Sequence, residues 1–301
     1  MDLSVKIGKM TLQNPILTAS GTFGYGPEFS DYLDLNKIGG FCTKGISIEP
    51  RGGNPAPRIV ETASGMLNSI GLENCGSEAF LKKVMPTIKD VKSAIIVNFY
   101  AGTEEDFIRL AEILSVDERI DALEMNLSCP NVKKGGSAFG ANPELIERLT
   151  KSIKNVTDKT LIVKLSPNVT DITATALAAE SGGADSVSLI NTLIGTAVDR
   201  ENRTFILGNK IGGLSGPAIK PVALRMVWQV AKAVKIPVIG MGGISNLEDV
   251  LDFLIVGAKA VQIGAWNFIN PSIAAEMVDG LENYLKERKE TLAELTGSIK
   301  G

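Results

Sequence analysis

The chain of 301 residues is 44% hydrophobic and 22% charged, which is the composition of an ordinary globular protein and excludes a disordered chain. Its 31 basic and 34 acidic residues give a formal net charge of −3, which argues against a nucleic-acid-binding surface. The chain has no histidine and no Cys-x-x-Cys pair among its three cysteines, which excludes imidazole bases, zinc sites and iron–sulfur clusters built from this chain alone, so we expect no metal.

No uncharged apolar run approaches the roughly 18 residues that a membrane-spanning helix needs. The longest candidate, residues 253–269, contains Lys259 and Gln262. Residues 1–6 lack the basic region and apolar stretch of a signal peptide. We therefore expect a cytoplasmic protein that does not associate with a membrane.

Short β-rich runs alternate with longer helical patterns. The predicted strands cover residues 15–19, 40–43, 95–98, 122–126, 161–165, 186–190, 237–240 and 260–263. Several are continuous apolar runs, as expected for parallel strands buried on both faces. Eight strand–helix units predict an eight-fold (β/α) TIM barrel with inserted loops at its C-terminal face, formed by residues 1–301 as a single domain.

Several helices have clear start signals. We predict N-caps at Thr103, Asn142, Thr170 and Asn246, where a polar side chain precedes a helical pattern. The last two of these caps open helices over 171–180 and 247–256, and a C-terminal helix with mixed charges covers about 272–295.

Three connections are too long to be simple turns: 44–76, 129–141 and 191–216. Loops of this length in compact domains are usually functional or disordered. Each follows a predicted strand, which places it on the catalytic face of a barrel.

Glycine turns end the last two predicted strands. Gly242 and Gly243 follow one strand, and Gly264 and Ala265 follow the next. Glycine lets backbone N–H groups approach a phosphate closely, and the loops after strands seven and eight form the usual phosphate site of a barrel. The ligand is a flavin mononucleotide or a sugar phosphate, between which the glycines do not discriminate.

Cys129 follows the predicted strand 122–126, within the run Asn-Leu-Ser-Cys-Pro-Asn. In a chain without histidine, a thiolate at a strand end is a credible base or nucleophile. Cys42 lies inside a strand run and is expected to be an inert buried side chain. Cys75 has no partner motif and is left without a role.

Two lysines lie at strand ends. Lys44 follows the run Phe-Cys-Thr, and Lys164 interrupts the apolar run Leu-Ile-Val-Lys-Leu. Either Lys164 extends to solvent at an edge, or it is a cation that faces the barrel opening and stabilises an anion or a reduced cofactor. The asparagines at 68, 98, 126, 131 and 191 together favour a small planar polar ligand, because amides both donate and accept hydrogen bonds.

Taken together, these motifs resemble the class 1 dihydroorotate dehydrogenases along nearly the whole chain. The matching segments are 19–24, 43–45, 68–72, 126–131, 163–168, 191–192, 242–243 and 263–265. The resemblance implies a TIM barrel that binds FMN and oxidises dihydroorotate to orotate in pyrimidine biosynthesis.

The resemblance also implies roles for individual residues. Cys129 is the expected general base, with Lys44 and Lys164 as further catalytic residues. The expected FMN contacts are Ser20, Lys44, Gly45, Asn98, Asn126, Lys164, Ile190, Gly216, Gly242, Gly243, Gly264 and Ala265. The expected substrate contacts are Lys44, Asn68, Ser69, Ile70, Gly71, Leu72, Asn126, Asn191 and Thr192. Residues 129–141 are a candidate lid, with Gly135 and Gly136 as hinges.

Within class 1, segments 19–24, 68–72 and 132–136 are similar to the B type. That type passes electrons to an iron–sulfur FAD subunit and then to NAD, in a heterotetramer built on a homodimer of the barrel chain. The alternatives are a fumarate-linked A-type enzyme, a flavin-dependent RNA uridine reductase and a non-catalytic phosphate-binding barrel. The negative charge disfavours the RNA enzyme.

Overall fold

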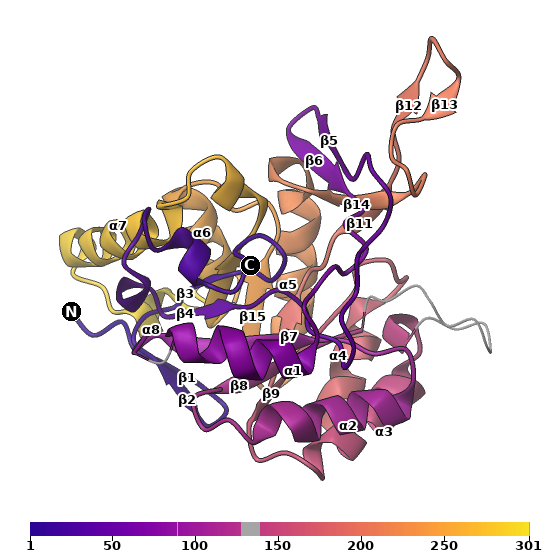
Figure 1. The fold of residues 1–301 in the computed structure, drawn as a ribbon. Coiled ribbons are helices and arrows are strands. Elements are labelled where there is room, and N and C mark those ends of the chain that lie inside the picture. The colour runs from indigo at the N-terminus through magenta and orange to yellow at the C-terminus, as the bar shows by residue number, and fades with distance from the viewer. Residues whose placement is uncertain (89, 128–138, 301) are drawn as a thin grey trace.

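The computed structural model describes residues 1–88, 90–127 and 139–300. Eight parallel strands close into a barrel in the order β10-β15-β16-β3-β4-β7-β8-β9, and helices surround it (Figure 1). The barrel strands are β3 (Ile16–Thr18), β4 (Gly40–Cys42), β7 (Ala94–Phe99), β8 (Ala122–Asn126), β9 (Thr160–Lys164), β10 (Ser186–Leu189), β15 (Val238–Met241) and β16 (Ala260–Ile263). The predicted eight-fold barrel is confirmed.

Each predicted strand coincides with a barrel strand to within one residue at either end. The agreement follows from burial, because every residue of β3, β4 and β7 is buried. Strands covered on both faces carry continuous apolar runs, and such runs are visible in a single sequence.

Several of the helices that follow the barrel strands begin at a side-chain cap. Thr103, Asn142 and Asn246 each accept a hydrogen bond from a backbone N–H in the first turn, as predicted. Such a cap stabilises a helix by about 1 kcal/mol. The helices are α2 (Glu104–Ser115), α3 (Pro143–Lys154), α4 (Ile172–Ser181), α5 (Lys220–Ala233), α6 (Leu247–Ile255), α7 (Ile273–Arg288) and α8 (Leu292–Leu295).

Two helix predictions need correction. The N-cap of α4 is Asp171 rather than Thr170, because the Asp171 carboxylate accepts from Thr173 N. The predicted helix 272–295 is two helices. Lys289 adopts left-handed backbone angles (φ 54°) that end α7, and Thr291 then opens α8 with a capping box to Glu294.

Shorter helical turns complete the connections. The 3-10 helices are Pro27–Phe29, Leu35–Lys37, Met85–Ile88, Phe139–Ala141, Pro217–Ile219 and Ala265–Phe268. The short helix α1 (Ser77–Ala79) runs into a π turn at Phe80–Val84. The predicted loop 129–141 lies outside the described residues except for its last three.

An N-terminal hairpin closes the amino end of the barrel. It is formed by β1 (Val5–Ile7) and β2 (Met10–Leu12), and its turn packs against β9 where Lys9 N donates to Thr160 Oγ1 at 3.0 Å. Its buried side chains join the lower interior of the barrel in one apolar cluster, which contains Ile7, Met10, Leu12, Leu17, Cys42, Ala94, Ile96, Ala122, Ile162, Ile239 and Ala260. This cluster fills much of the lower interior of the barrel with apolar side chains, while Thr160 and Ser186 are buried polar residues at the amino ends of β9 and β10.

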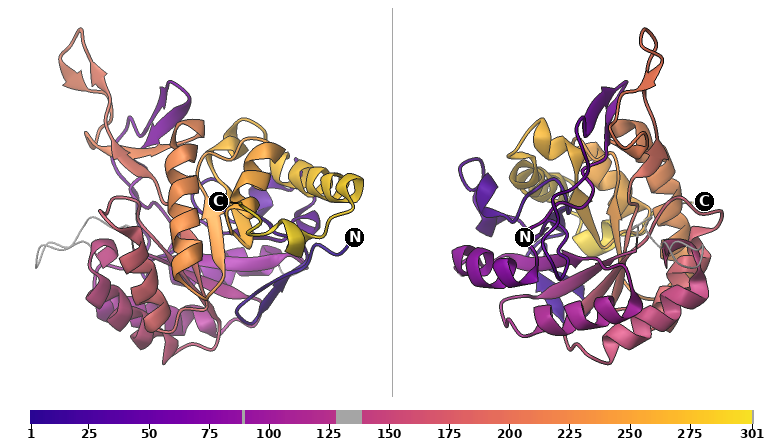
Figure 2. Two further views of the ribbon diagram at one scale, coloured as in Figure 1. Left: turned by 180° about the vertical axis from the view of Figure 1, so that it is seen from behind. Right: turned by 45° about the vertical axis from the view of Figure 1, so that its right-hand side comes forward.

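The long connections 44–76 and 191–216 contain strands that the sequence analysis missed. The segment after β4 contributes β5 (Ile59–Thr62) and β6 (Gly65–Asn68), and the segment after β10 contributes β11 (Leu193–Gly195) and β14 (Gly212–Ser215). They form one sheet in the order β11-β14-β6-β5. From it the hairpin of β12 (Val198–Asp199) and β13 (Thr204–Phe205) projects away from the barrel (Figures 1 and 2). We call the four strands β11, β14, β6 and β5 the insertion sheet.

Candidate active site

Every barrel strand has a predicted site residue at or just beyond its carboxyl end, and we call this rim the barrel mouth. Because the carboxyl ends of parallel barrel strands meet on one face, the fold brings these residues together. In strand order they are Ser20 after β3, Lys44 and Gly45 after β4, Asn98 in β7, Asn126 in β8, Lys164 in β9, Ile190 to Thr192 after β10, Gly242 and Gly243 after β15, and Gly264 and Ala265 after β16. Cys129 lies outside the described residues.

The insertion sheet carries the remaining predicted substrate contacts. Asn68 ends β6 and pairs with Gly213 of β14, and its side-chain Nδ2 donates to Gly213 O at 3.4 Å. A Cβ atom on Gly213 would lie 2.1 Å from Thr192 Oγ1, so Thr192 packs directly against the same glycine. The sheet therefore places Asn68 beside Thr192, although they lie in different insertions.

One buried amide organises the loop that follows β6. Asn74 Nδ2 donates to Leu72 O at 2.9 Å, Ser47 Oγ at 2.8 Å and Tyr100 OH at 2.9 Å, while its Oδ1 accepts from Gly76 N at 2.8 Å. The Tyr100 hydroxyl also donates a hydrogen bond to Leu72 O, at 2.9 Å. These bonds hold the end of the predicted substrate segment 68–72 against the segment after β4.

Lys44 adds positive charge near this loop. The Arg58 guanidinium, which donates to Glu73 Oε2 at 2.6 Å, and secondarily the Lys44 ammonium hold the pKa of Glu73 below its usual range. The Lys44 backbone is fixed because its N–H donates to Gly24 O at 2.7 Å. Lys44, which follows β4 at the barrel mouth, is thus close enough for its charge to act on Glu73.

Glycine backbones pack closely where β15 meets the start of α5. Gly243 has φ +80°, and a Cβ atom there would lie 2.9 Å from Lys220 N and 3.0 Å from Gly216 O. Gly242 has φ +126°, and a Cβ atom added there would lie 2.8 Å from Ala223 Cβ. These conformations require glycine. They set the turn after β15 against the N-terminus of a 14-residue helix, where backbone N–H groups and the helix dipole favour a phosphate.

A carboxylate lies inside the barrel below the mouth. Glu124 of β8 is fully buried, and its Oε1 accepts from Ser188 Oγ at 2.8 Å and Gln262 Nε2 at 2.9 Å. Its Oε2 accepts from Asn98 Nδ2 at 2.7 Å and Cys42 Sγ at 3.2 Å. We call Glu124 and its partners, Cys42, Asn98, Lys164, Ser188 and Gln262, the polar layer.

Lys164 belongs to this layer rather than to the solvent. The residue is 4% exposed, and its Nζ lies 3.8 Å from Glu124 Oε2. The interpretation in which Lys164 extends to solvent at an edge is wrong. Burial alone raises the pKa of Glu124, but Lys164 and the hydrogen bonds from Gln262, Asn98 and Ser188 outweigh it and lower the pKa overall.

The sequence analysis missed Glu124, Ser188 and Gln262 as members of the site. Glu124 interrupts the apolar run Ala-Leu-Glu-Met, and Gln262 interrupts Ala-Val-Gln-Ile, which is the same signal that identified Lys164. Cys42 is buried as predicted, but it is not merely an apolar side chain. Burial, and then the Glu124 charge, raises the pKa of its thiol, so Cys42 stays protonated and donates to that carboxylate.

Buried acceptors in the barrel suit a planar polar ligand. Asn98 Oδ1 and Gln262 Oε1 are buried and have no hydrogen-bond partner among the described residues. A Cβ atom on Gly45 would lie 2.8 Å from Asn98 Oδ1, so the Lys44–Gly45 backbone approaches this acceptor closely. Together with the glycine cradle and the buried cation Lys164, these groups fit the ring, phosphate and anionic reduced form of a flavin mononucleotide.

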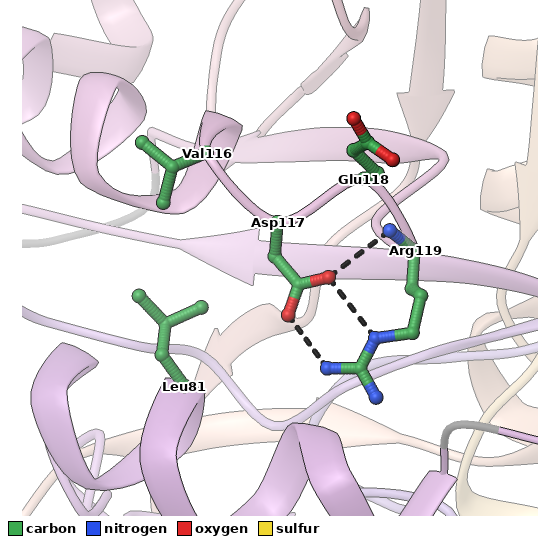
Figure 3. A pocket seen from close by; sticks show the side chains of 5 residues that line it. All are labelled: Leu81, Val116, Asp117, Glu118 and Arg119. Atoms are coloured by element: carbon green, nitrogen blue, oxygen red, sulfur yellow. Dashed lines mark hydrogen bonds and ion pairs between the residues drawn. The ribbon is translucent and has the colours of Figure 1, made fainter.

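The pocket shown in Figure 3 lies elsewhere. It has a volume of about 490 Å³ and is lined by Leu81, Val116, Asp117, Glu118 and Arg119. Two of these lining residues, Asp117 and Arg119, form an ion pair at 2.7 Å. Residues 116–119 precede β8, so this pocket is at the amino end of the barrel, opposite the mouth. It therefore contributes nothing to the candidate site.

Two features are absent from residues 1–88, 90–127 and 139–300. Within them, no three Asp, Glu or Cys side chains gather into a set that could hold a metal ion. No helix in the same ranges is long and apolar enough to cross a membrane.

Comparisons with known proteins agree with the geometry. The family model described as dihydroorotate dehydrogenase matches residues 2–285. A protein of Thermoanaerobacter sp. (strain X514), named dihydroorotate dehydrogenase B (NAD(+)), catalytic subunit, is 54% identical over 301 residues, covering 100% of this chain and 99% of its own length. Proteins of the same name from Trichlorobacter lovleyi and Bacteroides fragilis are 54% and 52% identical, with 99% of each chain covered.

Proposed function

The chain belongs to the dihydroorotate dehydrogenase family, and from this premise we propose that it is the catalytic subunit of a B-type enzyme that oxidises dihydroorotate to orotate with FMN. Residues 1–301 act as one FMN-binding barrel domain in the cytoplasm and serve de novo pyrimidine biosynthesis. The observation that carries the proposal is the barrel mouth, where all eight strands contribute a predicted site residue.

The cofactor assignment depends on three local features. The glycine cradle at Gly216, Gly242 and Gly243 suits the phosphate, with Gly264 and Ala265 after the next strand. Asn98 Oδ1 offers an acceptor to the ring, and Lys164 offers a buried positive charge. When bound, FMN accepts the hydride that leaves C6 of dihydroorotate.

The chain's own residues bind and orient the substrate. Asn68 to Leu72, Asn126, Asn191 and Thr192 hold the pyrimidine ring and its carboxylate. Lys44 offsets the anionic charge of the substrate, and Lys164 stabilises the negative charge that develops on reduction. The Asn74 hydrogen bonds fix the loop after β6. The loss of conformational entropy that ordering this loop requires therefore occurs on folding, before the substrate binds.

Cys129 is the proposed base. It follows β8 three residues after Asn126, on the connection that leaves the barrel mouth. In this role its thiolate takes the proton from C5 of the substrate as the hydride leaves C6. An ordinary thiol has a pKa of about 8.5, so activity near neutral pH requires surroundings that favour the thiolate.

Electrons leave this subunit through a partner. The relatives carry NAD(+) and "catalytic subunit" in their names, yet this chain has no Gly-x-Gly-x-x-Gly after a strand and too few cysteines for a cluster. We propose an iron–sulfur subunit with FAD, docked on a homodimer of this chain to form a heterotetramer.

The deciding experiment purifies this chain alone and measures its visible absorption and its oxidation of dihydroorotate. We expect bound FMN, orotate formation with an artificial dye acceptor, and no reduction of NAD until the partner subunit is added. A protein that neither contains nor takes up FMN would refute the proposal and favour the phosphate-binding barrel. NAD reduction by the isolated chain would refute the partner, and efficient turnover with fumarate alone would indicate an A-type enzyme.

A further inference from the structure

The barrel interior holds an ion pair whose anion is fixed more firmly than its cation. Glu124 accepts hydrogen bonds from Ser188, Gln262, Asn98 and Cys42, which come from β10, β16, β7 and β4. With Glu124 itself on β8, the carboxylate is tied to five of the eight barrel strands. It cannot move without breaking bonds to several strands.

Lys164 depends on this carboxylate. In the described part of the chain, Glu124 is the only acidic side chain within ion-pair distance of Lys164 Nζ. Among the described residues, the titratable groups on other strands that interact with this ammonium are Glu124 on β8 and Cys42 on β4. Since the Cys42 thiol stays protonated, Glu124 supplies the negative charge. A buried ammonium without such a partner tends to lose its proton.

We propose that Glu124 is a positioning residue that holds the Lys164 ammonium and its charge at the barrel mouth, where that charge would act on the proposed flavin. This inference rests on the proposed function. It separates two tasks within the polar layer: Lys164 acts on the cofactor, and Glu124 acts only through Lys164. The register supports the separation, because Lys164 pairs with Asn126 at the end of β8, two residues beyond Glu124.

The first test needs no cofactor. The unfolding free energies of flavin-free wild type, Glu124→Gln, Lys164→Met and the double variant form a thermodynamic cycle. Removing one charge leaves the other buried and unpaired, whereas removing both leaves neither. We expect each single variant to be destabilised and the double variant to lose less than the sum of the two. Additive losses would overturn the proposal.

The second test follows the midpoint potential of bound FMN from pH 6 to 10. In wild type we expect the potential to change smoothly with pH. In Glu124→Gln we expect an additional break in the curve, where Lys164 loses its proton, and at least tenfold weaker FMN binding above it. The break should vanish in the double variant. Glu118→Gln, an exposed glutamate at the amino end of β8, is the matched control and should behave as wild type.

The outcomes separate the two proposals. If Glu124→Gln gives the wild-type curve and the wild-type FMN affinity, Glu124 does not act through Lys164. If Glu124→Gln does not fold alone, recovery of folding in the double variant would show that the two charges depend on each other, and failure of the double variant to fold as well would overturn the proposal. A wild-type protein without FMN would refute the proposed function instead, and the unfolding cycle would still decide whether Glu124 and Lys164 are coupled.

Discussion

Asn98 and Glu124 occupy paired positions on neighbouring strands β7 and β8, and Asn98 Nδ2 donates a 2.7 Å hydrogen bond to Glu124 Oε2. Because a carboxylate only accepts hydrogen bonds, this bond fixes the orientation of the Asn98 amide, with Nδ2 toward Glu124. Asn98 Oδ1 is left as a buried acceptor with no partner in the described ranges. One buried charge thereby determines the polarity of a group at the proposed flavin site.

Replacing Asn98 by Asp tests this relationship. Two buried carboxylates at hydrogen-bond distance cannot both stay ionised, so Asn98→Asp should lower the unfolding free energy at pH 7 by about 3–5 kcal/mol. The loss should be smaller near pH 5, where one carboxylate gains a proton more easily. Urea unfolding measures both values. Asn98→Ala, which removes one donor without adding charge, should cost about 1–3 kcal/mol. A fully stable Asn98→Asp variant at pH 7 would contradict the geometry.

The pKa of Glu124 predicts how stability depends on pH. Its folded-state value lies below the ordinary 4.5, because Lys164 and the hydrogen bonds outweigh the effect of burial. The stabilisation is therefore fully present above pH 4.5 and is lost as the pH falls toward the lower folded-state value. We expect the difference in unfolding free energy between wild type and Glu124→Gln to shrink as the pH falls below 4.5. A difference independent of pH from 3 to 7 would show that Glu124 is not ionised in the folded protein.

The glycine cradle gives a prediction about cofactor retention. In Gly243→Ala the new Cβ meets backbone atoms of Lys220 and Gly216, in a conformation that disfavours side chains. We expect a loss of about 1–3 kcal/mol in unfolding free energy and at least tenfold weaker FMN binding. Gly102→Ala is the control at the same rim, because nothing lies within 4 Å of its added Cβ. Equal FMN content in the two variants would exclude a phosphate site at Gly243.

Cys129 is tested by two substitutions. Cys129→Ala should abolish dihydroorotate oxidation near neutral pH while FMN stays bound, because no base remains. Cys129→Ser should keep weak activity that rises with pH, since a hydroxyl is much harder to deprotonate than a thiol. Steady-state rates from pH 6 to 10 with a dye acceptor distinguish the variants. Turnover of Cys129→Ala close to wild type at pH 7 would eliminate Cys129 as the base.

The barrel could be predicted from the sequence because its strands are locally encoded. Runs such as 94–99 and 160–164 are mostly apolar, and all of their residues are buried. The insertion sheet could not be predicted. Its strands are short and half-exposed, and their pairing depends on the contact of β6 with β14, far apart in the chain.

The candidate site divides in the same way. Lys164 and the glycines at 242–243 are visible because each breaks a local pattern. Glu124 breaks one too, but the sequence does not show that four donors converge on it. The role of Asn74 depends on three segments that meet only in the folded protein, around Ser47, Leu72 and Tyr100.

The pairing of β6 with β14 has a consequence for protein engineering. The insertions after β4 and β10 are not independent modules, because Asn68, Gly213 and Thr192 meet across their shared sheet. A chimaera that takes only one insertion from a relative would join mismatched strand edges and displace the loop after β6. Altering the range of accepted substrates by segment exchange therefore requires both insertions to be transplanted together.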